Sequence, residues 1–275
     1  MSQVYNIYHK KKRNLFFGLS VINQLIIINI LAFIFSILII NIFGEDFFLA
    51  NFSLSPLLIL SGEKLWTFFT SMFMHGSFFH IFANMFSLFF IGNFLEGIIG
   101  RKRFFWVYII SGLIGGIFFV LAGSIFAGNI PGVGASGAIF GLLGVLAVLV
   151  PHSKIYLIAG PLIIIIIDAV LFKFIPGNLV SLFSSILNVL LFIMIFAIFS
   201  MNSRFRKLAV PIELPMWLLP IIAIIPLLLV EFVLEISLPI GNSAHIGGLV
   251  VGLTYGVYLR KKFPKKTERL RNYFR

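Results

Sequence analysis

Residues 20–43 of this 275-residue chain read SVINQLIIINILAFIFSILIINIF, a run without a single charged side chain. A helix of this length crosses the hydrocarbon core of a bilayer, which is roughly 30 Å thick. The run is too long for the apolar region of a signal peptide, and no A-x-A cleavage site follows it. It therefore predicts a membrane-spanning helix.

The composition of the whole chain agrees with this reading. Hydrophobic residues make up 60% of the chain and charged residues only 11%, and the mean hydropathy is +1.10. A backbone in lipid is satisfied only by helices or by a closed barrel. The apolar runs are continuous, without the polar/apolar alternation of barrel strands, so helices are favoured. We expect an all-α, polytopic transmembrane helical bundle.

About eight spans of membrane-crossing length can be drawn, within one transmembrane domain over residues 1–275. Short basic tails at 1–19 and 261–275 flank them. The expected spans are 20–43, 78–99, 104–127, 136–150, 155–175, 180–200, 211–236 and 244–260.

The basic residues set an orientation. With the N-terminus inside, all 21 Lys and Arg residues except Lys64 and Lys173 fall in inside segments, as the positive-inside rule requires. We therefore expect an integral membrane protein with both termini cytoplasmic, and the bias to Ile, Phe and Lys suggests a prokaryotic plasma membrane. The net charge of +12 then needs no nucleic acid. The absence of cysteine excludes disulfides, thiolate catalysis and cysteine-ligated metals.

Polar groups inside a bilayer are costly, so they are candidates for function. His80 and Asn84 are one helical turn apart on one face of the 78–99 span, and both can donate hydrogen bonds to a developing oxyanion. The alternative is that they only bond a neighbouring helix.

Ser136 lies where the glycine-rich stretch around Gly134 and Gly137 becomes a helix. The free N–H groups and partial positive charge of a helix N-terminus favour an alkoxide and a nearby oxyanion, which suits a nucleophile. The alternative is a Ser cap on a helix that packs through small residues.

His245 begins the last span and is followed by Gly248 and Gly252, a spacing that allows close helix packing. Gly137 and Gly141 have the same spacing, so this helix pair can bring His245 onto Ser136. Three spans separate the two residues, so both helices start at the outer face, as does the span that carries His80 and Asn84.

These residues resemble the motifs of the rhomboid family of intramembrane serine proteases. The motifs are H-x-x-x-N (His80, Asn84), G-x-S-G (Gly134 to Gly137) and A-H-x-x-G-x-x-x-G (Ala244, His245, Gly248, Gly252), with His75 as a further match. The resemblance implies a Ser136–His245 dyad with no third carboxylate and no cofactor or metal. His80, Asn84 and the Ser136 N–H would stabilise the oxyanion, and the partners would be transmembrane protein substrates in the lipid bilayer.

Three features depart from the family pattern. Trp66-Thr67 stands where Trp-Arg is frequent, and Phe140 stands where Tyr is frequent. Phe140 can still stack on His245, but it has no hydroxyl to donate. The stretch of about 155–200 is an extra helix pair beyond a six-helix core.

Two other functions compete with proteolysis: a non-proteolytic rhomboid-like factor that binds membrane proteins, and a transporter. Retention of both Ser136 and His245 argues against the first. Clustering of the motif residues near one face, without matching halves, argues against the second. Asp168, Glu231 and Glu235 are the weaker candidates for an ion pathway. The sequence sets no oligomeric state.

Overall fold

The computed structural model describes residues 18–127, 130–198, 204, 207, 210–234 and 241–274. The helices are α2 (Val21–Phe43), α3 (Glu45–Phe52), α4 (Pro56–Leu60), α5 (Thr67–Thr70), α6 (Phe78–Ile99), α7 (Arg101–Ala122), α8 (Ser136–Leu149), α9 (Ala159–Phe174), α10 (Gly177–Ile198), α12 (Leu219–Leu234), α13 (Asn242–Lys262) and α14 (Pro264–Tyr273). A π-helical turn, Gly123–Ala127, extends α7. The strands are β1 (Lys154–Ile158) and β2 (Pro211–Pro215).

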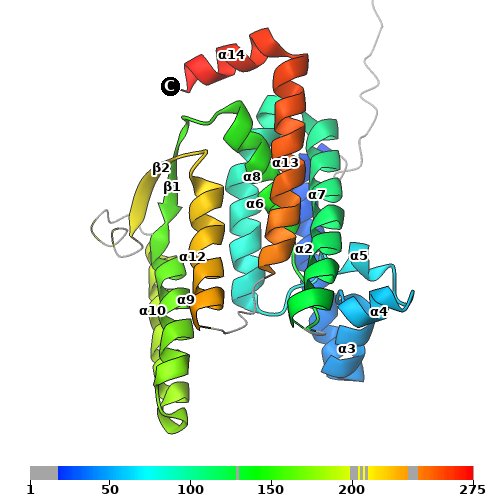
Figure 1. Ribbon diagram of the computed structural model, residues 1–275, viewed down its shortest axis with the longest axis vertical. Helices are drawn as coiled ribbons and strands as arrows, with labels where there is room; N and C mark the ends of the chain where they lie inside the picture. The colour runs from blue at the N-terminus through cyan, green and yellow to red at the C-terminus, as the bar shows by residue number, and fades with distance from the viewer. Residues whose placement is uncertain are drawn as a thin grey trace, which may run out of the picture.

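Helix α8 is the centre of the bundle. It packs against α6, α7, α12 and α13 (Figure 1), and nearly all of its side chains are buried, including Leu142 and Leu146, which have no exposed surface. The outward faces of the surrounding helices carry exposed Phe, Ile and Leu side chains. An apolar exterior around a buried core suits a bundle in lipid, so the predicted all-α polytopic fold is confirmed.

Four helices of the described chain are both long and apolar enough to cross a membrane, namely α2, α6, the α7 stretch and α10. Helices α8 and α12 are apolar but shorter. Because α8 is enclosed by other helices, its backbone contacts protein rather than lipid, and a full-length span is not needed there. By length and composition the structure thus supports the expected spans 20–43, 78–99, 104–127 and 180–200. The other expected spans correspond to shorter or more polar helices.

Two of the expected spans begin differently from the prediction. The stretches 155–175 and 211–236 open with β1 and β2, and their helices begin only at Ala159 and Leu219. The strands pair antiparallel, with Lys154 opposite Pro215. Proline at both ends of β2 opposes helix formation there, and the pairing satisfies the backbone instead.

An ion pair joins the exposed faces of these strands. Lys154 Nζ lies 2.6 Å from Glu213 Oε1, and Tyr156 donates a 3.2 Å hydrogen bond to the same carboxylate. The hydrogen bond from Lys154 lowers the pKa of Glu213, and Glu213 in turn raises the pKa of Lys154. Both side chains are solvent-exposed, so we expect this ion pair to contribute little to the free energy of unfolding.

The segment predicted as a basic tail at 261–275 is largely helical. Helix α13 continues to Lys262, and α14 follows and contacts α8 and α13. Thr267 of α14 is buried, and Phe274 makes an edge contact with Phe94 of α6, with ring centroids 5.1 Å apart. A single apolar side of an otherwise charged helix is enough to dock it on the bundle.

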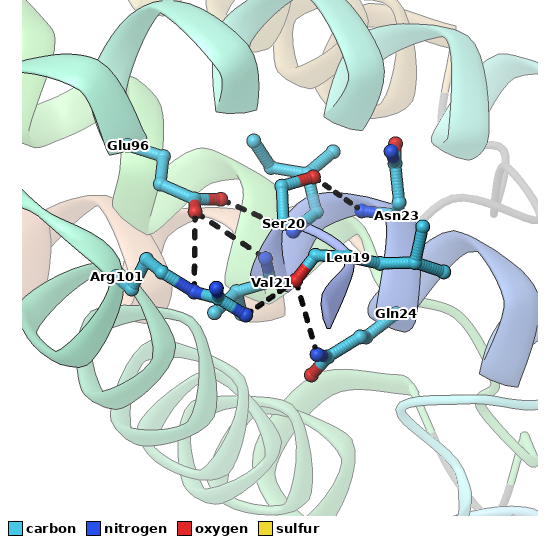
Figure 2. Close-up of polar contacts among 8 residues, drawn as sticks. Leu19, Ser20, Val21, Asn23, Gln24, Glu96 and Arg101 are labelled. Atoms are coloured by element: carbon cyan, nitrogen blue, oxygen red, sulfur yellow. Dashed lines mark hydrogen bonds and ion pairs between the residues drawn. The ribbon is translucent and has the colours of Figure 1, made fainter. Parts of the chain in front are cut away.

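Glu96 fastens the start of α2 to α6 (Figure 2). Its carboxylate accepts hydrogen bonds from the backbone N–H groups of Val21 (3.3 Å) and Ile22 (3.2 Å). Arg101 lies 3.9 Å from the carboxylate and also donates to the carbonyl of Leu19. A negative charge at a helix N-terminus satisfies free N–H groups and matches the helix dipole. The side chain of Glu96 thus ties α2, α6 and α7 together.

Candidate active site

Ser136 and His245 meet at the start of two adjacent helices. Ser136 is the first residue of α8, and His245 lies in the first turn of α13. The Nε2 atom of His245 is 2.7 Å from the Ser136 Oγ, the distance of a good hydrogen bond. His245 is buried, whereas Ser136 is half-buried and remains accessible.

The other nitrogen of His245, Nδ1, is buried and has no hydrogen-bond partner among the described residues. The face of the ring rests instead on Phe140, with centroids 4.3 Å apart and 16° between the planes. Stacking therefore fixes the orientation of the imidazole here, a task that a carboxylate performs in a Ser-His-Asp triad.

Glycine contacts between α8 and α13 set this geometry. A β-carbon at Gly248 would lie 1.9 Å from the Gly137 carbonyl oxygen, and one at Gly252 would lie 1.9 Å from the Gly141 carbonyl oxygen. Any larger residue would force the helices apart. The two small-residue pairs predicted from the sequence are therefore in direct contact, one below the other along the helix interface.

His80 and Asn84 lie against the loop that leads into Ser136. A β-carbon at Gly134, whose φ is +132°, would lie 2.8 Å from His80 Nε2 and 3.9 Å from Asn84 Nδ2. Only glycine combines this φ with so close an approach. Asn84 is buried and donates one bond, of 3.0 Å, to the His80 carbonyl, which leaves its second amide hydrogen for another acceptor.

The first loop, residues 44–77 between α2 and α6, supports the Ser136 loop, a contact that the sequence did not predict. Leu54 and Gly132 exchange two backbone hydrogen bonds, of 2.8 and 2.9 Å. The N–H of Gly134 donates to the Ser71 carbonyl at 2.8 Å. The stretch 132–134 is thus held on both sides. In the sequence, only Gly132 and Gly134 indicate that another stretch of backbone lies close to this loop.

His75 lies in the loop before α6 and is almost fully buried, at 2% exposure. Its Nδ1 is 3.3 Å from the Phe73 carbonyl oxygen, and its ring meets His80 edge-on with centroids 5.1 Å apart. Burial, more than the neighbouring His80, lowers the pKa of His75 to about 3, so the ring is neutral at pH 7. His75 backs His80 rather than the Ser136–His245 pair.

Trp66, which with Thr67 stands where the rhomboid pattern often has Trp-Arg, contacts Asn51 and Lys64. The Trp66 ring nitrogen donates to the Asn51 carbonyl at 2.9 Å, and Lys64 donates to the Asn51 side chain at 2.8 Å. The Lys64 ammonium also lies 5.1 Å from the centre of the Trp66 ring. Asn51 and Lys64 therefore anchor this end of the first loop.

The remaining polar candidates lie elsewhere. Asp168 accepts a 2.8 Å hydrogen bond from Ser184, which links α9 to α10. Glu235 and the side chain of Glu231 lie outside the described residues. Within the described part of the chain, no three His, Cys, Asp or Glu side chains gather as a metal site.

This geometry defines a membrane helical bundle with a serine–histidine pair at one end of its core. The sequence comparisons agree with it: the Rhomboid domain model matches residues 62–200 and 183–262. The chain belongs to the rhomboid family, whose members are generally intramembrane serine proteases.

Three relatives illustrate the similarity. RHOMBOID-like protein 5 of Arabidopsis thaliana is 43% identical over 100 residues, covering 36% of this chain and 31% of the relative. The putative rhomboid protease YdcA of Bacillus subtilis is 35% identical over 130 residues, covering 44% and 60%. The inactive RHOMBOID-like protein 8 of Arabidopsis thaliana is 34% identical over 99 residues, covering 36% and 27%. The match thus spans less than two thirds of each relative's length, and the family includes a member named inactive.

Proposed function

We propose that this protein is a serine endopeptidase that cleaves peptide bonds in or beside transmembrane segments of membrane proteins. The observation that carries the proposal is the 2.7 Å contact between His245 Nε2 and Ser136 Oγ, inside a bundle with an apolar exterior. A nucleophile and a base within hydrogen-bond reach are what acyl transfer requires. Residues 1–275 would act as one domain.

In the proposed reaction, His245 Nε2 takes the hydroxyl proton as Ser136 Oγ attacks the scissile carbonyl. The imidazolium then returns the proton to the leaving amine, and an acyl-serine remains. Water then attacks the acyl group as His245 takes its proton, and the imidazolium returns that proton to the leaving Ser136 Oγ, which releases the acid product and restores the dyad. Ser136 is half-buried, which supports access for both substrate and water.

The oxyanion of each tetrahedral intermediate needs donors fixed in advance. His80 and the free amide hydrogen of Asn84 lie beside Gly134, two residues before Ser136. The Ser136 N–H, at the helix N-terminus, is the third donor of the proposed pocket. Gly134 keeps the space between these donors and the backbone small.

The Ser136 site lies at the opposite end of α13 from Arg260, Lys261 and Lys262, which occupy its last turn. By the positive-inside rule the basic end faces the cytoplasm. The proposed site therefore opens toward the outer face of a prokaryotic plasma membrane, and the chain termini lie inside.

The test is cleavage of a single-span substrate by the purified full chain in detergent, comparing wild type with Ser136→Ala and His245→Ala. Ser243→Ala, near His245 on α13, is the matched control. We expect cleavage by wild type and the control, and a loss of at least about 10³-fold in both dyad variants. Cleavage that persists in Ser136→Ala would exclude Ser136 as nucleophile.

A second candidate is a rhomboid-like protein that binds membrane proteins without cleaving them, which the relative named inactive favours. Labelling with a serine-reactive fluorophosphonate separates the two. Labelling of wild type that is absent in Ser136→Ala supports the protease, and absence of labelling in a folded wild type supports the binding protein.

A further inference from the structure

A groove separate from the Ser136 site runs between α7 and α13. These helices approach closely at Gly115, where an added β-carbon would lie 2.8 Å from the Ala244 carbonyl oxygen, and at Gly247, where one would lie 3.0 Å from the Gly115 Cα. Toward the basic end of the bundle, larger side chains line a cavity of about 370 Å³. Its lining is Arg103, Trp106, Val107 and Ile110 of α7 with Val250, Val251, Thr254, Tyr255 and Tyr258 of α13.

The groove is apolar along its length and faces outward. Trp106, Ile110 and Val250 are each about half exposed, at 51%, 46% and 45%, and buried Val107 forms the floor. In the membrane these exposed side chains contact lipid chains. A cavity of this size with an apolar lining suits a slender apolar ligand with one polar end.

Two cations lie at the basic end of the groove: Arg103 is part of its lining, and Lys262 contacts the lining residue Tyr258. Arg103 lies in the first turn of α7 and Lys262 ends α13. The centroid of the Phe263 ring lies 5.1 Å from the Arg103 guanidinium carbon and 5.9 Å from the Lys262 ammonium. Lys262 also donates a 2.6 Å hydrogen bond to the Tyr258 hydroxyl. Among the described residues neither cation forms an ion pair. Both exposed cations therefore rest against aromatic rings, and no carboxylate among the described residues neutralises their charge.

We propose that this groove binds an anionic phospholipid. An acyl chain lies along Trp106, Ile110 and Val250, and the headgroup phosphate is bound by Arg103, Lys262 and the Tyr258 hydroxyl. The charge selects the occupant: a zwitterionic lipid brings its own cation to the same place, and an uncharged partner leaves two ordered cations unpaired. The proposal does not depend on proteolysis.

The first test is native mass spectrometry of the full chain, incubated in detergent with equal amounts of phosphatidylglycerol and phosphatidylcholine of identical acyl chains. We expect wild type to retain phosphatidylglycerol in roughly tenfold preference, since two basic groups act on it. Arg103→Gln/Lys262→Gln should lose the preference. Lys265→Gln/Lys266→Gln, which removes two exposed charges from α14 at the same end, should keep it.

An equal loss in both double variants overturns the proposal, because diffuse attraction of anionic lipid to the basic end then accounts for the binding. No preference in wild type also overturns it, because the groove then does not select lipid by charge. A second measurement needs no charge variant. The fluorescence of Trp106 is taken as the part of the signal that is lost in Trp106→Phe. In nanodiscs, brominated phosphatidylglycerol at low mole fraction should quench this Trp106 fluorescence more strongly than brominated phosphatidylcholine does. Equal quenching by the two lipids also overturns the proposal.

Discussion

The ring of Phe140 lies nearly parallel to the imidazole of His245, with 4.3 Å between the ring centroids. Replacing it by leucine keeps the site apolar but removes the flat surface on which the imidazole rests. Aromatic pairs contribute about 0.5–1.5 kcal/mol beyond their buried area, so Phe140→Leu should lower kcat about 2- to 10-fold. Phe140→Tyr keeps the ring and should retain kcat. Equal losses in both variants would contradict an orienting role for stacking, and cleavage kinetics in detergent supply the measurement.

The α8–α13 interface should not tolerate a methyl group. In Gly248→Ala the new carbon meets the Gly137 carbonyl at 1.9 Å, so backbone must move; we expect a loss of about 3 kcal/mol of stability or more. The matched control is Gly97→Ala, where the new carbon meets nothing within 4 Å. Alanine is the better helix former by ~1 kcal/mol, so that variant should melt no lower than wild type. Thermal unfolding in detergent distinguishes them, and equal melting temperatures would disprove the close contact.

Gly134→Ala should damage activity more than stability. The substitution strains a backbone at φ +132° and pushes His80 away from the Ser136 loop, so the proposed oxyanion donors lose their positions. We expect kcat to fall by about 10²-fold, the cost of losing one such donor. Gly76→Ala, in the neighbouring loop, places its new carbon 4.0 Å from Val133 and should leave kcat unchanged. An unchanged kcat in Gly134→Ala would show that His80 and Asn84 are not oxyanion donors.

Glu96→Gln should loosen α2. The amide keeps the shape of the side chain but loses the charge that binds the α2 N–H groups and Arg101. Hydrogen bonds to charged groups contribute about 1.5–3 kcal/mol, so we expect a loss of that order in the free energy of unfolding. Glu63→Gln changes an exposed carboxylate that forms no ion pair within the described residues, and it should have no effect. Proteolytic nicking around residue 20 would reveal the loosened end.

Much of the bundle is predictable from local pattern. The apolar runs locate α2, α6, α7 and α10 closely, because only a continuous apolar helix suits a bilayer. The pairing of α8 with α13 follows from two matching glycine spacings and from the parity of the spans. The contact between Ser136 and His245 follows from the same pairing, so the geometry of the pair was anticipated while its role stays a proposal.

Features that depend on distant backbone were not predictable. Short apolar segments such as 154–158 and 211–215 read equally well as helix or strand, and only their mutual pairing decides between them. The support of Gly132 by Leu54 carries no side-chain signature at all, since both bonds are between backbones. In α14, charge dominates the sequence, and the few residues that dock it are visible only beside their partners.

The two members of the proposed dyad are 109 positions apart in the chain. A ribosome adds roughly 5–20 residues per second, so a nascent chain carries Ser136 for roughly 5–20 s before its base exists. During that time Ser136 lacks the histidine that would act as its base in the proposed reaction. Synthesis of α13 supplies both His245 and the glycines Gly248 and Gly252 that pack against α8. Under the proposed function, the order of synthesis would thus delay assembly of the dyad until α13 has been made.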